Sequence, residues 1–222
     1  MIKEMYLKLS GVDGRIIQNS FWSQYENSSK VAIFYPGYRY PTEAPLFHFL
    51  KLHFLSNGWS ILALEYRYNE NIAFLNLPDA EQTEYLSSET KLLQNQLESQ
   101  LKFDRFCFVS KSLGTTIAFK MLENDFALLD NKKFQYIWLT PADSNMQICD
   151  YIIENKIPSI YIIGDADPYY DEKLVSKIKD QMNGSYLIVP KAGHLFNHGE
   201  DLLKTMFNNQ KIIEFLIKNI MA

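Results

Sequence analysis

The chain has 222 residues, 47% of them hydrophobic and 22% charged, with a formal net charge of −4. This composition is typical of a globular protein with ample apolar material for a core, and we expect one domain spanning residues 1–222. The charge provides no broad basic field, which argues against nucleic-acid binding. No stretch reaches the roughly 18 apolar residues of a membrane span, and the first residues lack a signal-peptide pattern. We therefore expect neither a nucleic acid nor a membrane as a partner.

The two cysteines, Cys107 and Cys149, lie far apart in the sequence and in apolar surroundings. This placement favours buried free thiols over a disulfide or part of a metal site. Free thiols suit a reducing compartment, so we expect a cytoplasmic protein. We expect no cofactor, and the sequence leaves the oligomeric state open.

Strand and helix patterns alternate along the chain after an initial hairpin. Residues 2–9 and 15–22 alternate polar and apolar residues on either side of a Ser-Gly-Val-Asp-Gly turn, which predicts two antiparallel strands. Short runs rich in β-branched and aromatic residues predict six further strands, at 30–36, 59–68, 104–110, 133–141, 158–165 and 184–190. Helical periodicity predicts helices at 44–58, 78–101, 115–125, 146–155, 172–182 and 201–220.

This order of elements predicts an α/β fold. We expect a mostly parallel eight-stranded sheet with an N-terminal antiparallel hairpin and helices on both faces. In such sheets ligands bind beyond the carboxyl ends of the strands, so the residues that follow each strand are the candidates for chemistry.

A serine, an acid and a histidine follow three of the predicted strands, in that chain order. Ser112 lies in Ser110-Lys111-Ser112-Leu113-Gly114, Asp167 follows Gly164 by three residues, and His194 ends an Ala-Gly-His sequence. Each has an ordinary structural explanation on its own: a helix cap, a turn residue before proline, and a loop hydrogen bond. Their joint placement at strand ends favours nucleophilic catalysis instead.

With these motifs the chain resembles the α/β-hydrolase fold family along its whole length, since the triad of that family runs in the order nucleophile, acid, histidine. The resemblance implies that Ser112 is the nucleophile, Asp167 the acid and His194 the base. Gly37-Tyr38 matches the oxyanion turn of the family, so the backbone N–H groups of Tyr38 and Leu113 would form the oxyanion hole.

The resemblance implies a serine hydrolase that cleaves a small or extended soluble carboxylic ester or thioester through an acyl-enzyme. Only about 17 residues separate the strand ending at Pro141 from the next strand, so a large lid is not expected there. The chain departs from the family pattern at Ser110, where glycine is usual, and at Pro36, where histidine is common. A catalytically inactive binding or scaffold protein of the same fold is the alternative.

Other assignments of these residues remain open on the sequence alone. Asp165 is an alternative acid, Lys111 an alternative activator of the serine, and His198 could join His194 at a zinc site. The acidic segment 165–172 could bind calcium but lacks the spacing of a calcium loop, and we expect no metal. Arg67 either borders the site or holds its own loop through hydrogen bonds. The residues expected to line the substrate pocket are Arg39, Tyr40, Lys111, Tyr169 and Phe196.

Overall fold

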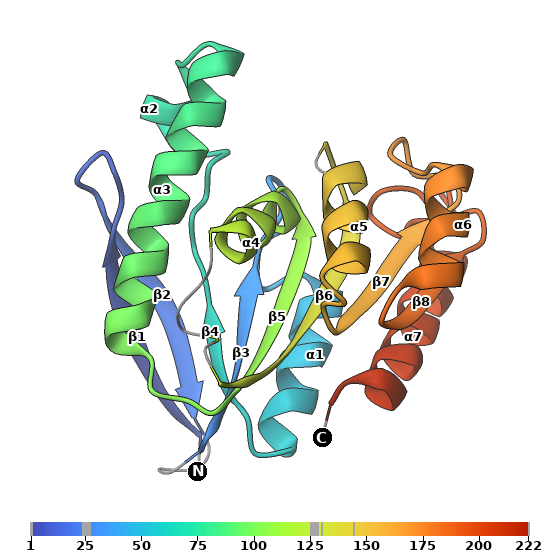
Figure 1. The fold of residues 1–222 in the computed structure, drawn as a ribbon, viewed down its shortest axis with the longest axis horizontal. Coiled ribbons are helices and arrows are strands. Elements are labelled where there is room, and N and C mark those ends of the chain that lie inside the picture. Colours follow the sequence, from blue (N-terminus) through green and yellow to red (C-terminus); the bar gives the residue numbers. More distant parts are fainter. Residues whose placement is uncertain (1, 24–27, 125–128, 130, 144, 222) are drawn as a thin grey trace.

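The computed structural model describes residues 2–23, 28–124, 129, 131–143 and 145–221. Within these residues, all the strands belong to one sheet (Figure 1). The strand order is β1-β2-β4-β3-β5-β6-β7-β8. The hairpin β1–β2 is antiparallel, β2 pairs antiparallel with β4, and the remaining pairs are parallel. The strands are β1 (Lys3–Ser10), β2 (Ile16–Ser23), β3 (Lys30–Tyr35), β4 (Ser60–Ala63), β5 (Arg105–Ser112), β6 (Lys133–Pro141), β7 (Ser159–Gly164) and β8 (Gly184–Val189).

Helices cover both faces of this sheet. Alternate residues of the central strands point to opposite faces, so Val31 and Ile33 of β3 pack in one apolar cluster while Ala32 and Phe34 pack in the other. The first cluster includes residues of α3 (Asp79–Gln100), α4 (Leu113–Glu123), α5 (Asn145–Glu154) and α6 (Glu172–Gln181). The second includes residues of α1 (Pro45–Ser56) and α7 (Leu202–Asn219). This confirms the predicted fold class, and in the described part of the short connection between β6 and β7 the regular structure is α5.

The structure corrects the predicted elements between β4 and α3 in two respects. The strand predicted at 59–68 ends at Ala63, because the chain leaves the sheet at Glu65, whose N–H bonds the Asn19 side chain, and turns through a positive φ at Arg67. The short helix α2 (Ile72–Leu75), capped by Asn71, was not predicted, since four residues are too few to show a helical period.

The helix predicted at 115–125 begins two residues earlier, at Leu113, and ends at Glu123. Its predicted last residue, Asp125, lies outside the described residues, as do Met1 and Ala222 of the predicted domain. In the part of the chain that is described, no helix is long and apolar enough to cross a membrane.

Candidate active site

Ser112 lies at a sharp turn between β5 and α4. It is the last residue of the strand and the N-cap of the helix, with a φ of 51° and a ψ of −123°. A positive φ is unusual for a serine and costs on the order of 1 to 3 kcal/mol, so the surrounding packing must hold it. Gly114 makes that packing possible, because a Cβ there would lie 2.2 Å from the Tyr35 carbonyl oxygen. The helix therefore begins in direct contact with the end of β3.

The two departures from the hydrolase pattern are accommodated by this turn. Ser110 is fully buried, and its hydroxyl donates a hydrogen bond of 2.9 Å to the carbonyl of Ile137 on β6. A serine therefore fits where glycine is usual, because its small side chain points away from the turn and is satisfied by the neighbouring strand. Pro36 is buried at the end of β3 and is followed by Gly37. A Cβ added at Gly37 would lie 3.2 Å from the Ser112 Cβ, so the turn after Pro36 packs closely against Ser112.

The structure brings Ser112, His194 and Asp167 together in one chain of contacts. The His194 Nε2 atom lies 2.8 Å from Ser112 Oγ, and its Nδ1 atom lies 2.8 Å from Asp167 Oδ2. A carboxylate only accepts hydrogen bonds, so Nδ1 carries the proton and Nε2 is free to accept the proton of Ser112. The Asp167 side chain is fully buried, whereas 25% of the His194 side chain is exposed. Ser112 and the imidazole are therefore partly accessible to solvent, while the carboxylate is shielded.

The loop after β7 separates the two candidate acids. The second oxygen of Asp167, Oδ1, accepts the Tyr169 N–H at 2.9 Å, which fixes the carboxylate against His194. Asp165 is exposed, and its Oδ1 accepts the backbone N–H of Lys191 at 2.5 Å. Asp165 thus joins the loops after β7 and β8, while Asp167 contacts the histidine.

The predicted oxyanion donors lie in two structures that flank Ser112. Residues Gly37 to Tyr40 form a tight turn closed by two backbone hydrogen bonds, of 3.0 and 3.3 Å, and Tyr38 is one of its central residues. Leu113 is the first residue of α4, so its N–H has no carbonyl partner within the helix and lies at the positive end of the helix dipole. The two predicted donors thus lie on the turn that contacts Ser112 through Gly37 and at the start of the helix that Ser112 caps, and the oxyanion hole itself stays a prediction.

The predicted pocket residues do not all border the triad. The Tyr169 ring lies 5.4 Å from the His194 ring and the residue is 37% exposed, so it borders the reacting groups. Arg39 is exposed, and its guanidinium lies 5.9 Å from the ring centroid of Tyr38. Tyr40 is partly buried, with its ring edge-to-face against Phe47.

The prediction that Lys111 and Phe196 line an open pocket is wrong. Both side chains are fully buried. Alternation along β5 directs Lys111 to the sheet face opposite the one that Ser110 faces, and Phe196 packs in the second apolar cluster on that face. The Lys111 Nζ atom donates to Thr140 Oγ1 at 2.5 Å and to the His194 carbonyl oxygen at 2.7 Å, so it is not positioned as the activator of Ser112. Burial lowers the pKa of Lys111 to about 7, although the negative charge of Asp167 opposes part of this effect. Thr140 was not predicted from the sequence; its place at the end of a strand was the available clue.

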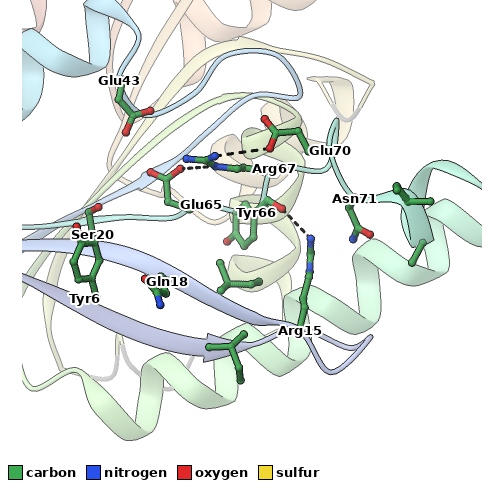
Figure 2. Close-up of a pocket in the computed structure, with 14 residues that line it drawn as sticks. Tyr6, Arg15, Gln18, Ser20, Glu43, Glu65, Tyr66, Arg67, Glu70 and Asn71 are labelled. Atoms are coloured by element: carbon green, nitrogen blue, oxygen red, sulfur yellow. Dashed lines mark hydrogen bonds and ion pairs between the residues drawn. The ribbon is translucent and has the colours of Figure 1, made fainter.

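Arg67 lies in a different part of the molecule, in a cleft of about 800 Å³ between the β1–β2 hairpin and the segment after β4. Figure 2 shows its guanidinium between the carboxylates of Glu65 and Glu70, at 3.6 and 3.8 Å. These contacts support the interpretation that Arg67 holds its loop. None of the three triad residues lines this cleft.

Within the described ranges, no three His, Cys, Asp or Glu side chains are grouped to hold a metal ion. The backbone N–H of His198 bonds Thr205 Oγ1, and the residue forms a bridge with Asp201 that leads into α7. Cys107 and Cys149 are both buried and free.

The fold is that of the α/β-hydrolases. Similar solved structures include a dienelactone hydrolase from Anabaena variabilis, which is 15% identical with a TM-score of 0.61 over 99% of each chain. An esterase from Pyrococcus furiosus is 15% identical with a TM-score of 0.63, over 99% of this chain and 92% of that one. Est1E from Butyrivibrio proteoclasticus, solved with bound ferulic acid, is 12% identical with a TM-score of 0.62, over 97% of this chain and 98% of that one. No protein-family model and no curated protein matches the sequence.

Proposed function

We propose that the protein is a serine hydrolase that cleaves a small or extended soluble carboxylic ester or thioester through an acyl-enzyme on Ser112. The observation that carries this proposal is the unbroken chain of two 2.8 Å contacts from Ser112 through His194 to Asp167. Such a chain is the arrangement by which a histidine, oriented by a buried acid, activates a serine hydroxyl.

The reaction follows from the positions of these groups. His194 Nε2 takes the Ser112 proton as Oγ attacks the substrate carbonyl, and the N–H groups of Tyr38 and Leu113 stabilise the oxyanion that forms. The intermediate then expels the alcohol or thiol, which takes the proton from His194. Water, deprotonated by His194, attacks the acyl-enzyme and releases the acid, so that Ser112 regains its proton. Asp167 keeps the imidazole in the required tautomer throughout.

The substrate class is supported by the surroundings of Ser112. In the described part of the β6–β7 connection, the ten residues of α5 are the regular structure, which supports a site without a large lid at this connection. The Tyr169 ring beside His194 offers an apolar surface to one side of a small-molecule substrate. Ferulic acid in Est1E and the dienelactone hydrolase activity named for another structural neighbour agree with carboxylic ester substrates. The buried free thiols support a reducing compartment, the cytoplasm.

A fluorophosphonate probe tests the proposal, because it reacts with an activated serine. We expect stoichiometric labelling of the wild-type protein and none of Ser112→Ala. Ser110→Ala is the matched control: it removes a serine two residues away that bonds Ile137 rather than the triad, and labelling should persist. A wild-type protein inert to the probe would instead favour a binding or scaffold protein of this fold.

A further inference from the structure

Lys111 is a fully buried lysine directly behind the triad. Its amino group donates to the carbonyl oxygen of His194, 2.7 Å away, and lies 4.9 Å from the ring centroids of both Tyr40 and Phe196. Neither of its hydrogen-bond acceptors is a carboxylate. Burying an amino group in this way costs free energy that an apolar side chain would avoid, so the lysine requires an explanation beyond packing.

The second acceptor, Thr140, has a strained backbone. Lys111 pairs with Leu139 and Ser112 pairs with Pro141, so Thr140 is an extra, unpaired residue in β6 opposite the turn at Ser112. Its φ is 41°, which is unfavourable for a β-branched residue. A bulge redirects a side chain, and here the Thr140 hydroxyl meets the Lys111 amino group at 2.5 Å. Strain of this kind is characteristic of functional sites.

These contacts connect two of the segments that build the triad, and they tie both to β6. Lys111 is adjacent to Ser112 on β5, the His194 carbonyl belongs to the loop after β8, and Thr140 is the penultimate residue of β6. The hydrogen bond from Lys111 thus reaches the loop after β8 at His194 itself, the residue whose imidazole must reach Ser112.

We propose that Lys111 is a positioning residue of the triad, whose amino group holds the His194 backbone at the distance from β5 at which the imidazole reaches Ser112. This inference rests on the proposed function. Lys111 does not touch the substrate, because it is fully buried; it acts through His194.

The groups around Lys111 show what its substitution changes. Two titratable residues lie near it: Tyr40, whose ring centroid is 4.9 Å from the amino group, and Asp167, whose charge acts on the amino group from the loop after β7. From His194 the amino group contacts the backbone carbonyl. Methionine has a similar length and volume but no donor. Lys111→Met therefore removes both hydrogen bonds while it keeps most of the packing against Phe196.

The test compares Lys111→Met with Lys51→Met. Lys51 is a matched control, because it is also buried and lies 4.7 Å from an aromatic ring, that of Trp22. Among the described residues, no hydrogen bond or ion pair joins it to Ser112, His194 or Asp167. Turnover of a short-chain nitrophenyl ester is expressed per site labelled by the fluorophosphonate, so misfolded molecules do not count. We expect Lys111→Met to lower kcat about 10- to 100-fold, as a misplacement of about 1 Å would. KM should change by less than about twofold, and Lys51→Met should match the wild type.

A second readout needs no substrate. The low-field NMR signal of the proton between His194 Nδ1 and Asp167 should broaden in Lys111→Met and stay sharp in Lys51→Met. If kcat per labelled site and this signal both match the wild type in Lys111→Met, the inference is overturned. If the wild-type protein is not labelled at all, the proposed function fails, and the NMR signal alone decides whether Lys111 positions His194.

Discussion

Replacing Gly114 by alanine should displace the turn between β5 and α4 that carries Ser112. The new Cβ would lie 2.2 Å from the carbonyl oxygen of Tyr35 and 2.7 Å from that of Pro36, whereas ordinary contact begins at about 3.4 Å. Both obstacles are backbone atoms of a central strand and its end, so no flexible side chain can move aside. The start of α4 must therefore shift by about 1 Å or more, and Leu113 and Ser112 must shift with it.

The expected loss follows from that displacement. A 1 Å error in the position of a reacting group costs about 10²-fold in rate, and overpacking of this kind costs about 1 to 3 kcal/mol of stability. We expect kcat/KM for a nitrophenyl ester to fall about 100-fold in Gly114→Ala, with a lower midpoint in urea unfolding. The control is Gly11→Ala, because the atoms nearest to its Cβ would belong to the side chains of Asp13 and Arg15, which can move aside. A Gly114→Ala protein with activity and stability within error of the wild type would refute the packing argument.

Three further results are expected. Asp167→Asn should favour the wrong imidazole tautomer and lower kcat by up to about 10⁴-fold, while Asp165→Asn should retain most activity; the reverse order would show that the acid is Asp165. EDTA and phenanthroline should leave ester hydrolysis unchanged, whereas a metal-dependent site would lose activity and regain it with zinc. Because burial lowers the Lys111 pKa from 10.5 to about 7, the unfolded chain binds a proton that the folded one lacks between these values, so stability should rise with pH across this range. The change in the free energy of unfolding has an upper limit of about 5 kcal/mol, at about 1.4 kcal/mol for each pKa unit. Urea unfolding of the wild-type protein and of Lys111→Met at pH 7 and 10 measures this change. Equal changes with pH in the two proteins would contradict the prediction.

The fold could be predicted from the sequence because its central strands, β3 to β7, are mostly buried on both faces and therefore appear as continuous apolar runs. The prediction of the end of β4 was wrong, because the local sequence pattern there favours a strand whereas tertiary contacts hold the chain in a loop. The residues after Ala63, Leu-Glu-Tyr-Arg-Tyr, continue a strand-like pattern, yet Tyr66 and Tyr68 are buried in a loop and not in the sheet. The burial of that loop depends on contacts from the distant hairpin, such as the Arg15 hydrogen bond to the Tyr66 carbonyl, which no local pattern reveals.

In the candidate site, too, some residues could be predicted from the sequence and others could not. Ser112, Asp167 and His194 could be singled out because each follows a strand within a recognisable motif, and the structure brings the three side chains into contact. Lys111 could not be placed from the sequence, because charge alone suggested an exposed position at the mouth of the site. Its burial depends on an acceptor in each of two segments distant in sequence, Thr140 and the His194 carbonyl.

The central claim is that ester cleavage passes through an acyl group on Ser112. The most direct measurement is acid quenching of wild-type protein during turnover of a nitrophenyl ester, followed by mass spectrometry of the peptides. We predict an added acyl mass on the peptide that contains Ser112, and no such mass and no turnover in Ser112→Ala. Undiminished turnover by Ser112→Ala, with no acylated peptide in the wild-type protein, would contradict the account.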